Sequence, residues 1–451
     1  MRTRKCKNNS IRNIRNGLRS GIRDGIRDGW KTITVSGNAK ERGYQHGAQL
    51  SQEIARLVEV FPQALEIHHH ISLEEYIDLS NKLARKQFDK CTEWREELEG
   101  MVEGALSNGV MVSVDFIFSW NMHHSISHKL YKQCAKPHHH HNHHHHHDHC
   151  SAFIATGDAT KDGKIVMAHN THTTFGLGQF FNIVQYVKPD KGHNFVMQTC
   201  PGSICSVVDW FLCGSGIIGC ETTIGDINYL PQYGLPYFCR IRECMQYAKT
   251  LDDCVRIMRE DNAGDYPCGW MFGDTNTNEI MLLEVAKTVA EPRKTKSGFF
   301  YGSNIAQDQY IRETQTTHGT SQPSLEKSVV ARSNRLEWLL NKKYWGKLDA
   351  NTAKLVIADH YDVYDEKMRM GSRSICKHVE VEPKFKKRPA KYPFGAIDGK
   401  VVTTDMAKKM VFLGRWGSSC GRVYRPTRTI KKLYPYVPNL RGEAWTRLCR
   451  P

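Results

Sequence analysis

The chain has 451 residues, of which 40% are hydrophobic and 24% charged, a composition typical of a folded protein with a sizeable core. It contains no apolar run of about 18 residues or more, so we expect no transmembrane helix. The net charge of +16 is concentrated at the ends: residues 1–40 carry eleven Lys and Arg against two acids, and residues 381–451 carry seventeen against four. We expect no nucleic-acid partner for the slightly acidic middle. The basic ends leave an anionic membrane surface open as a partner, and a nucleic acid as a less favoured one.

The first predicted segment is a basic, low-complexity arm over residues 1–35. Its repeat GLRS-GIRD-GIRD-G places a glycine in each turn of any helix, which costs about 1 kcal/mol each time. The arm lacks the apolar core of a secretory signal, so we slightly favour a cytoplasmic location and leave the compartment open. The fifteen cysteines form no C-x-x-C pair; most are expected to be reduced core residues, although their spacing does not exclude disulfides.

Residues 36–136 are predicted to form a helical N-terminal part. Apolar residues recur at helical spacing over residues 50–61 and again over residues 94–106. Between these stretches, Ser72 is followed three residues later by Glu75, which is the spacing of a capping box.

The hydrophobic period changes after a histidine-rich linker, residues 137–149. Seven segments from residue 150 onward have the pattern of strands separated by Asp-Gly, Pro-Gly or Asn-rich turns: SAFIATG, KIVMAHN, FFNIVQYVK, NFVMQT, GIIGCETTI, GWMFGDT and EIMLLEVA. Helices are predicted again at residues 251–260, with Thr250 as N-cap, and around residues 330–342. The layout predicts an α+β protein with helices packed on a large, mainly antiparallel sheet. A basic C-terminal tail is expected over residues 421–451.

Cys150 opens the first of these strands. Cleavage between His149 and Cys150 would give the cysteine a free α-amine, with a pKa of about 7.7–8.0, beside its own thiol. Such an amine can accept the thiol proton, which pairs a nucleophile with a base for acyl transfer within one residue. From the residue alone, a strand cysteine is more often part of the core.

Four segments resemble one family, the cysteine N-terminal nucleophile (Ntn) hydrolases related to acyl-CoA:6-aminopenicillanic acid acyltransferase: ERGYQHG (41–47), CSAFIATGDATKDGKIVMAHNTH (150–172), GIIGCETTIGDIN (216–228) and GWMFGDTNTNEIMLLE (269–284). Two more, YGSNIA (301–306) and FGAIDGKVV (394–402), are closest to its phospholipase B-like branch. The resemblance spans residues 36–410. It implies an αββα sandwich, here residues 150–420, made as an inactive precursor that is cleaved just before the cysteine.

The resemblance assigns the nucleophile to Cys150, with its α-amine as the base. It places His169 and Asn170 where the family has groups that orient this amine. Two features depart from the family. A small residue is usual where His149 stands, and the acyltransferase branch has an aspartate near the place of His172. A third difference concerns location: phospholipase B-like relatives are typically secreted or lysosomal, whereas no secretory signal is recognised in the basic arm.

The resemblance also assigns the groups that stabilise the tetrahedral intermediate. Thr222 or Thr223 matches the position near the first oxyanion contact, and Asn304 matches an asparagine whose side-chain NH₂ stabilises the oxyanion. Arg332 resembles a buried arginine near the nucleophile, with Arg335 as the alternative. Without the resemblance, the two threonines and Asn304 are ordinary strand and turn residues.

Metal sites are the other chemistry that the sequence suggests. Ten histidines lie among residues 138–149, but a homopolymeric run fixes no ligand geometry, and we interpret it as a replaceable linker. The stretch 274–284 departs from a calcium loop at its sixth and last positions, and a β-hairpin turn explains it better. We therefore expect neither a metal nor an organic cofactor.

Together these observations predict an autoprocessing hydrolase that cleaves an amide or ester bond through a Cys150 thioester. Its substrate would be a small acyl compound, either a lipid or an N-acyl compound; the oligomeric state is left open. The alternative is a catalytically silent family member that acts as a lipid-binding or structural protein.

Overall fold

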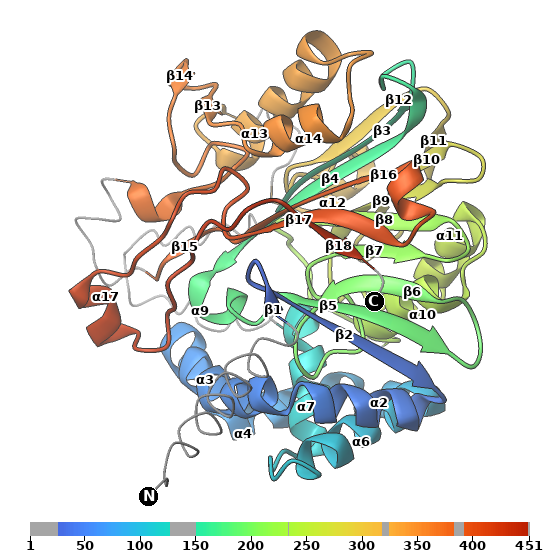
Figure 1. The fold of residues 1–451 in the computed structure, drawn as a ribbon, viewed down its shortest axis with the longest axis vertical. Coiled ribbons are helices and arrows are strands. Elements are labelled where there is room, and N and C mark those ends of the chain that lie inside the picture. Colours follow the sequence, from blue (N-terminus) through green and yellow to red (C-terminus); the bar gives the residue numbers. More distant parts are fainter. Residues whose placement is uncertain (1–25, 127–149, 233, 318–323, 383–391, 450–451) are drawn as a thin grey trace, which may run out of the picture.

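The structure is a computed structural model that describes residues 26–126, 150–232, 234–317, 324–382 and 392–449. Two β-sheets stack between layers of helices, so the predicted α+β class is confirmed (Figure 1). The helices of the N-terminal part lie at one end of this stack, and helices α13 (Ser328–Trp338) and α14 (Ala350–Ile357) lie at the other. No helix within the described ranges is long and apolar enough to span a membrane.

The larger sheet has nine strands, in the spatial order β1-β2-β5-β6-β7-β8-β9-β10-β11. Their bounds are β1 Ile26–Arg27, β2 Trp30–Gly37, β5 Ile183–Pro189, β6 Phe195–Thr199, β7 Trp210–Cys213, β8 Ile217–Thr223, β9 Cys268–Asp274, β10 Glu279–Val285 and β11 Arg293–Thr295. All its pairings are antiparallel except β2 with β5, which agrees with the mainly antiparallel sheet expected. Strands β9 and β10 form a hairpin over residues 274–279, as predicted for the stretch that resembles a calcium loop.

The second sheet has seven strands and carries Cys150. Its order is β12-β3-β4-β16-β17-β18, with β15 also paired to β4. The bounds are β12 Gly298–Gly302, β3 Cys150–Gly157, β4 Gly163–Thr174, β16 Asp398–Thr403, β17 Val411–Trp416, β18 Thr446–Cys449 and β15 Phe394–Ala396. A separate two-stranded ribbon joins β13 (Tyr361–Asp362) to β14 (Lys367–Met368).

Helices cover the outer faces of both sheets. Those of the described N-terminal part are α2 Ala39–Gln49, α3 Ser51–His69, α4 Leu73–Ser80, a π-helical turn Asn81–Arg85, α5 Lys86–Phe88, α6 Thr92–Leu106 and α7 Val114–Asn121. The later ones are α9 Phe175–Gly178, α10 Tyr237–Tyr247, α11 Leu251–Arg259, α12 Gln309–Gln315, α13, a π-helical turn Leu339–Lys343, α14, a 3₁₀ turn Val379–Val381, α16 Thr404–Ala407 and α17 Arg428–Leu433. The predicted caps are confirmed: Ser72 with Glu75 and Thr250 with Asp253 both form capping boxes.

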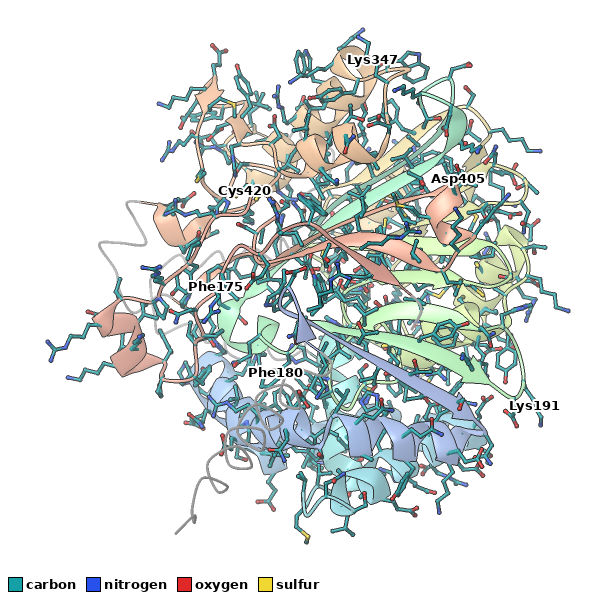
Figure 2. The ribbon with its side chains drawn as sticks, in the orientation of Figure 1. Phe175, Phe180, Lys191, Lys347, Asp405 and Cys420 are labelled. Carbon is teal, nitrogen blue, oxygen red and sulfur yellow. The ribbon has the colours of Figure 1, made fainter. Side chains whose placement is uncertain are left out.

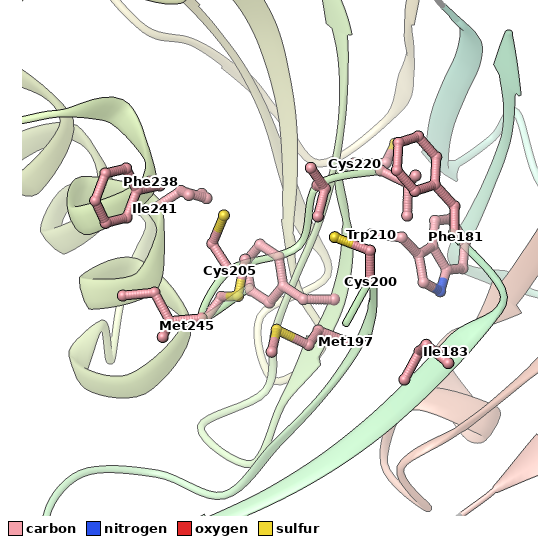
Figure 3. Packing of buried hydrophobic residues seen from close by; sticks show 14 of the residues in the cluster. Phe181, Ile183, Met197, Cys200, Cys205, Trp210, Cys220, Phe238, Ile241 and Met245 are labelled. Atoms are coloured by element: carbon pink, nitrogen blue, oxygen red, sulfur yellow. The ribbon is translucent and has the colours of Figure 1, made fainter. Parts of the chain in front are cut away.

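Strand β3 is buried on both faces, which explains its continuous apolar sequence. On one face Phe153 packs in a cluster with Leu336 and Val356 of the α13–α14 layer. On the other face Ile154 belongs to the main core between the sheets. In another part of that core, Phe238, Ile241 and Met245 of α10 face the strands that carry Met197 and Trp210 (Figure 3). Cys150 therefore begins a strand that is held rigidly from both sides.

The motif ERGYQHG has a structural role. A Cβ added at Gly43 would lie 2.0 Å from the carbonyl oxygen of Glu97, and one at Gly47 would lie 2.0 Å from that of Met101. Helices α2 and α6 therefore touch backbone to backbone. The Arg42 guanidinium, fully buried, donates from Nη2 to Glu97 Oε2 at 2.9 Å across this contact.

Two predicted boundaries were wrong. The arm expected to reach residue 35 ends earlier, because Trp30–Gly37 forms β2 and pairs in parallel with β5; residues 1–25 lie outside the described residues. The expected C-terminal tail is part of the fold, because β18 pairs with β17. The histidine linker and His149 also lie outside the described residues.

Candidate active site

Cys150 is the first residue of β3, and its side chain is buried, with 2% of the residue exposed. Its main-chain N–H donates to Asn304 Oδ1 at 3.4 Å, and its carbonyl oxygen accepts from Arg332 Nη1 at 2.8 Å. Three segments thus meet at this residue: the start of β3, the turn after β12 and helix α13.

Arg332 organises this meeting point. It is fully buried on α13, and besides Cys150 it donates to Ser151 Oγ at 2.9 Å and, through Nη2, to Asn304 Oδ1 at 2.8 Å. Arg335, the alternative left open by the sequence, instead forms an ion pair with Asp359, Nη2 to Oδ2 at 2.7 Å. Of the two arginines, Arg332 is the one that contacts Cys150.

Asn304 adopts a left-handed backbone conformation, with φ of +74°, which asparagine tolerates better than most residues. Its Oδ1 faces Cys150 N, and its Nδ2 donates to the carbonyl oxygen of Thr223 at 2.8 Å. A side-chain amide carries two N–H groups, so one remains beyond the contact with Thr223.

The His169–Asn170 pair is divided between the two faces of β4. Asn170 Nδ2 donates to the carbonyl oxygens of Ile357 and Ile375, at 2.7 and 3.2 Å, on the side of α14. His169 points to the other face, as alternation along a strand requires. Its ring is fully buried on that face. Burial, reinforced by the Lys400 ammonium, lowers the pKa of His169 well below its usual range, so the ring is neutral.

The two threonines of the ETT stretch occupy the end of β8. A Cβ added at Gly302 would lie 2.1 Å from Thr222 Oγ1, so this hydroxyl lies against the strand that leads to Asn304. The Thr223 hydroxyl is 2.7 Å from the Tyr266 hydroxyl, which donates to Glu221 Oε1 at 2.8 Å. Thr222 therefore lies beside the strand that leads to Asn304, and the Thr223 carbonyl oxygen accepts from Asn304 itself.

Two buried carboxylates, Asp209 and Glu221, were missed by the sequence analysis. One carboxyl oxygen of Asp209, one of Glu221 and the Cys150 sulfur all lie within 4.8 Å of one another. Glu221 stands directly before the two threonines, but nothing in the sequence marked it as buried. Each carboxylate already accepts a tyrosine hydroxyl, from Tyr237 to Asp209 at 3.1 Å and from Tyr266 to Glu221. The tyrosine hydroxyls already occupy these carboxyl oxygens, and the nearby Lys400 ammonium repels a positive ion, so the arrangement disfavours a bound cation.

These surroundings suppress ionisation in the uncleaved chain. Burial, then the charges of Glu221 and Asp209, raises the pKa of the Cys150 thiol well above its usual range, against the opposing effect of Lys400. Burial and the neighbouring Asp209 likewise raise the pKa of Glu221 well above its usual range. The Cys150 thiol is therefore protonated at neutral pH while its nitrogen remains in a peptide bond.

Fold and site together describe a two-sheet α+β protein with a buried cysteine at the start of an inner strand. No family model matches the chain. Part of the chain is similar in sequence to the phospholipase B-like 2 proteins of Rattus norvegicus and Mus musculus, each 29% identical over 28% of this chain, which confirms the predicted resemblance. An uncharacterized protein of Archaeoglobus fulgidus is 26% identical over 56% of the chain.

The chain matches less than half of the length of each relative: 43% of the Archaeoglobus protein, 24% of the rat protein and 23% of the mouse protein. Among solved structures, two variants of conjugated bile acid hydrolase from Clostridium perfringens align with 59% of this chain and 89% of theirs. Both are 8% identical to it, with TM-scores of 0.36 and 0.34.

Proposed function

We propose that the protein is an acyl hydrolase of the cysteine Ntn type, in which cleavage before Cys150 frees the nucleophile. The observation that carries this proposal is the position of the Cys150 nitrogen. This nitrogen begins a rigid inner strand and lies within hydrogen-bond distance of Asn304. Arg332 holds the carbonyl group of Cys150 and the Asn304 side chain together.

Cleavage would change the chemistry of this residue. The freed α-amine has an ordinary pKa close to neutral and can accept the Cys150 thiol proton. The Asp209 carboxyl group, within 4.8 Å of the Cys150 sulfur, is proposed to compensate the positive charge that results. The thiolate then attacks an acyl carbonyl, the leaving alcohol or amine takes up the proton, and water hydrolyses the thioester.

The oxyanion of this reaction needs donors. Asn304 is the candidate, because one N–H of its amide group remains beyond the contact with Thr223. A donor of this kind typically contributes about 10²–10³ in rate. His169, Thr222 and Thr223 are proposed to position the amine and substrate. Asn170 faces the opposite side of β4, and we propose that it supports the strand.

The test is hydrolysis of two substrate panels, phospholipid vesicles and N-acyl amines, by wild type, Cys150→Ala and Cys91→Ala. Cys91 is half-buried at the start of α6 and serves as the matched control. We expect turnover by wild type and Cys91→Ala alone, and an acid-quenched acyl adduct on the peptide that begins with Cys150. Turnover that survives Cys150→Ala would overturn the proposal.

The silent alternative rests on the buried Cys150 and the basic ends. It predicts binding to anionic vesicles that survives Cys150→Ala, without hydrolysis of either panel. The same vesicles therefore distinguish the two proposals, because an acyl hydrolase must release a hydrolysis product from them or from the N-acyl amines.

A further inference from the structure

A second cluster of reactive side chains lies outside the Cys150 site. It consists of His360, Cys376, His378 and Cys420, whose ligand atoms all lie within 4.8 Å of one another. His360 follows α14, Cys376 and His378 precede the 3₁₀ turn at Val379, and Cys420 lies in the loop after β17, where Figure 2 labels it. Three stretches of irregular backbone thus converge on one point.

The distances within this cluster match a tetrahedral metal. His378 Nε2 lies 3.3 Å from Cys376 Sγ and 3.3 Å from Cys420 Sγ. Zinc bonds of about 2.0–2.1 Å to nitrogen and 2.3 Å to sulfur place neighbouring tetrahedral ligands roughly 3.3–3.8 Å apart. Two thiols and two imidazoles are also the donor set that Zn²⁺ prefers in structural sites.

The outer contacts of the cluster fit the same conclusion. His378 Nδ1 lies 2.8 Å from Glu380 Oε1, and the side chains of His378 and Glu380 are 2% and 5% exposed. A carboxylate on the outer ring nitrogen fixes the orientation of a metal-bound histidine and leaves its other nitrogen free to ligate. Cys376 is fully buried.

We propose that His360, Cys376, His378 and Cys420 bind one structural Zn²⁺ ion. A Cys376–Cys420 disulfide would explain the two sulfurs but leave both imidazoles without a role. A nucleophile activated by His378 and Glu380 would need one thiol, whereas two thiols converge on the same nitrogen. This site is independent of the proposed hydrolase activity.

The ion would support the strand that faces Cys150. Ile375 and Ser419 each stand directly before a cysteine ligand, and both accept from Asn170 Nδ2, at 3.2 and 3.3 Å. Asn170 pairs across the sheet with Ser151, the residue after Cys150. Removing the ion would therefore loosen the backing of β3 and β4 and lower the thermal stability of the protein.

The test uses the full chain and must separate this site from the histidine tract of residues 138–149, which also offers imidazoles. Zinc is removed with a strong chelator under reducing conditions, and Co²⁺ is added back. Thiolate ligands produce a sulfur-to-cobalt charge-transfer band that histidines alone do not produce. The variants are Cys376→Ser, Cys420→Ser, and Cys91→Ser as a matched half-buried control.

We expect one tightly held zinc per chain after washing with a weak chelator, and a cobalt charge-transfer band in wild type and Cys91→Ser. Each ligand variant should lose the band and the tight zinc. His360→Cys should keep both, because it substitutes one zinc ligand for another, and this variant separates ligand loss from misfolding. Wild type without the band, or a Cys376–Cys420 disulfide in freshly purified protein, would overturn the proposal.

Discussion

The contact between α2 and α6 and the surroundings of Cys150 both bury ionisable groups, but they surround these groups with different neighbours. Between the helices, Glu97 is met by Arg42 and Arg242, and each of its oxygens accepts at 2.9 Å. Beside Cys150, Glu221 has another carboxyl group, Asp209, as its neighbour, and burial with this neighbour raises the pKa of Glu221 well above its usual range. Opposite charges in contact are what a buried structural contact requires, whereas a raised carboxyl pKa beside a buried cysteine is typical of a reactive site.

The largest expected effect outside the nucleophile comes from Asn304→Asp. This change removes the NH₂ donor and keeps an oxygen towards Cys150 N and Arg332. We expect kcat/KM for acyl hydrolysis to fall by about 10²–10³, because the oxyanion loses a donor. The control is Asn228→Asp, an exposed asparagine; an equal loss in both variants would contradict the role given to Asn304.

Glu97→Gln tests the other half of the comparison. The substitution leaves Arg42 and Arg242 buried with weakened compensation, and breaking such a pair costs about 3–5 kcal/mol. Denaturant unfolding of the variant should show this loss, whereas Glu99→Gln, a partly exposed neighbour on α6, should change stability by less than about 1 kcal/mol. An equal loss of stability in both variants would show that the buried contact of Glu97 with Arg42 and Arg242 does not stabilise the fold.

The pH dependence of stability follows from His46, which is fully buried. Its Nδ1 lies 2.8 Å from Gln185 Oε1 and its Nε2 accepts from Gly202 N–H at 2.8 Å, so both nitrogens of the neutral ring are hydrogen-bonded. Burial lowers its pKa to about 4. The unfolded chain therefore binds the extra proton, and stability present above the unfolded pKa is lost as pH falls from about 6.5 towards 4.

This loss should amount to about 3 kcal/mol, since each pKa unit corresponds to about 1.4 kcal/mol. Unfolding by denaturant at a series of pH values measures it. His46→Gln should flatten the slope in this range. A slope unchanged in the variant would assign the acid sensitivity to other groups, among them His169, whose pKa is lowered in the same direction.

The smallest effect is expected from Gly47→Ala. The added methyl would meet the carbonyl oxygen of Met101 at 2.0 Å, so α2 and α6 must separate. Overpacking of this kind costs about 1–3 kcal/mol. Lys40→Ala, an exposed change on the same helix, is the control in thermal unfolding, and a variant as stable as this control would contradict the backbone contact between the helices.

Local signals in the sequence predicted much of the fold. The strands beginning at residues 150, 163, 217 and 268 and the two capping boxes depend on neighbouring residues, so a pattern reveals them. The parallel pairing of β2 with β5 joins segments about 150 residues apart, and no local pattern encodes it.

The candidate site was predictable only where a motif named its residues. Cys150, Asn304 and Arg332 belong to recognised stretches and do meet in space. Asp209 comes from one loop and the four proposed zinc ligands come from three other stretches, so their proximity arises only when the chain folds. Burial and convergence in space are the properties that the sequence does not display.

The proposed mechanism requires that the chain be cut before Cys150, because only then does the cysteine carry a free α-amine beside its thiol. Intact mass and N-terminal sequencing of freshly purified wild type and Cys150→Ala test this directly. Two fragments are expected in the wild type, the larger beginning Cys-Ser-Ala-Phe, and an uncut chain in Cys150→Ala. A single uncut chain in both, persisting through incubation at mildly acidic and neutral pH, would contradict this mechanism.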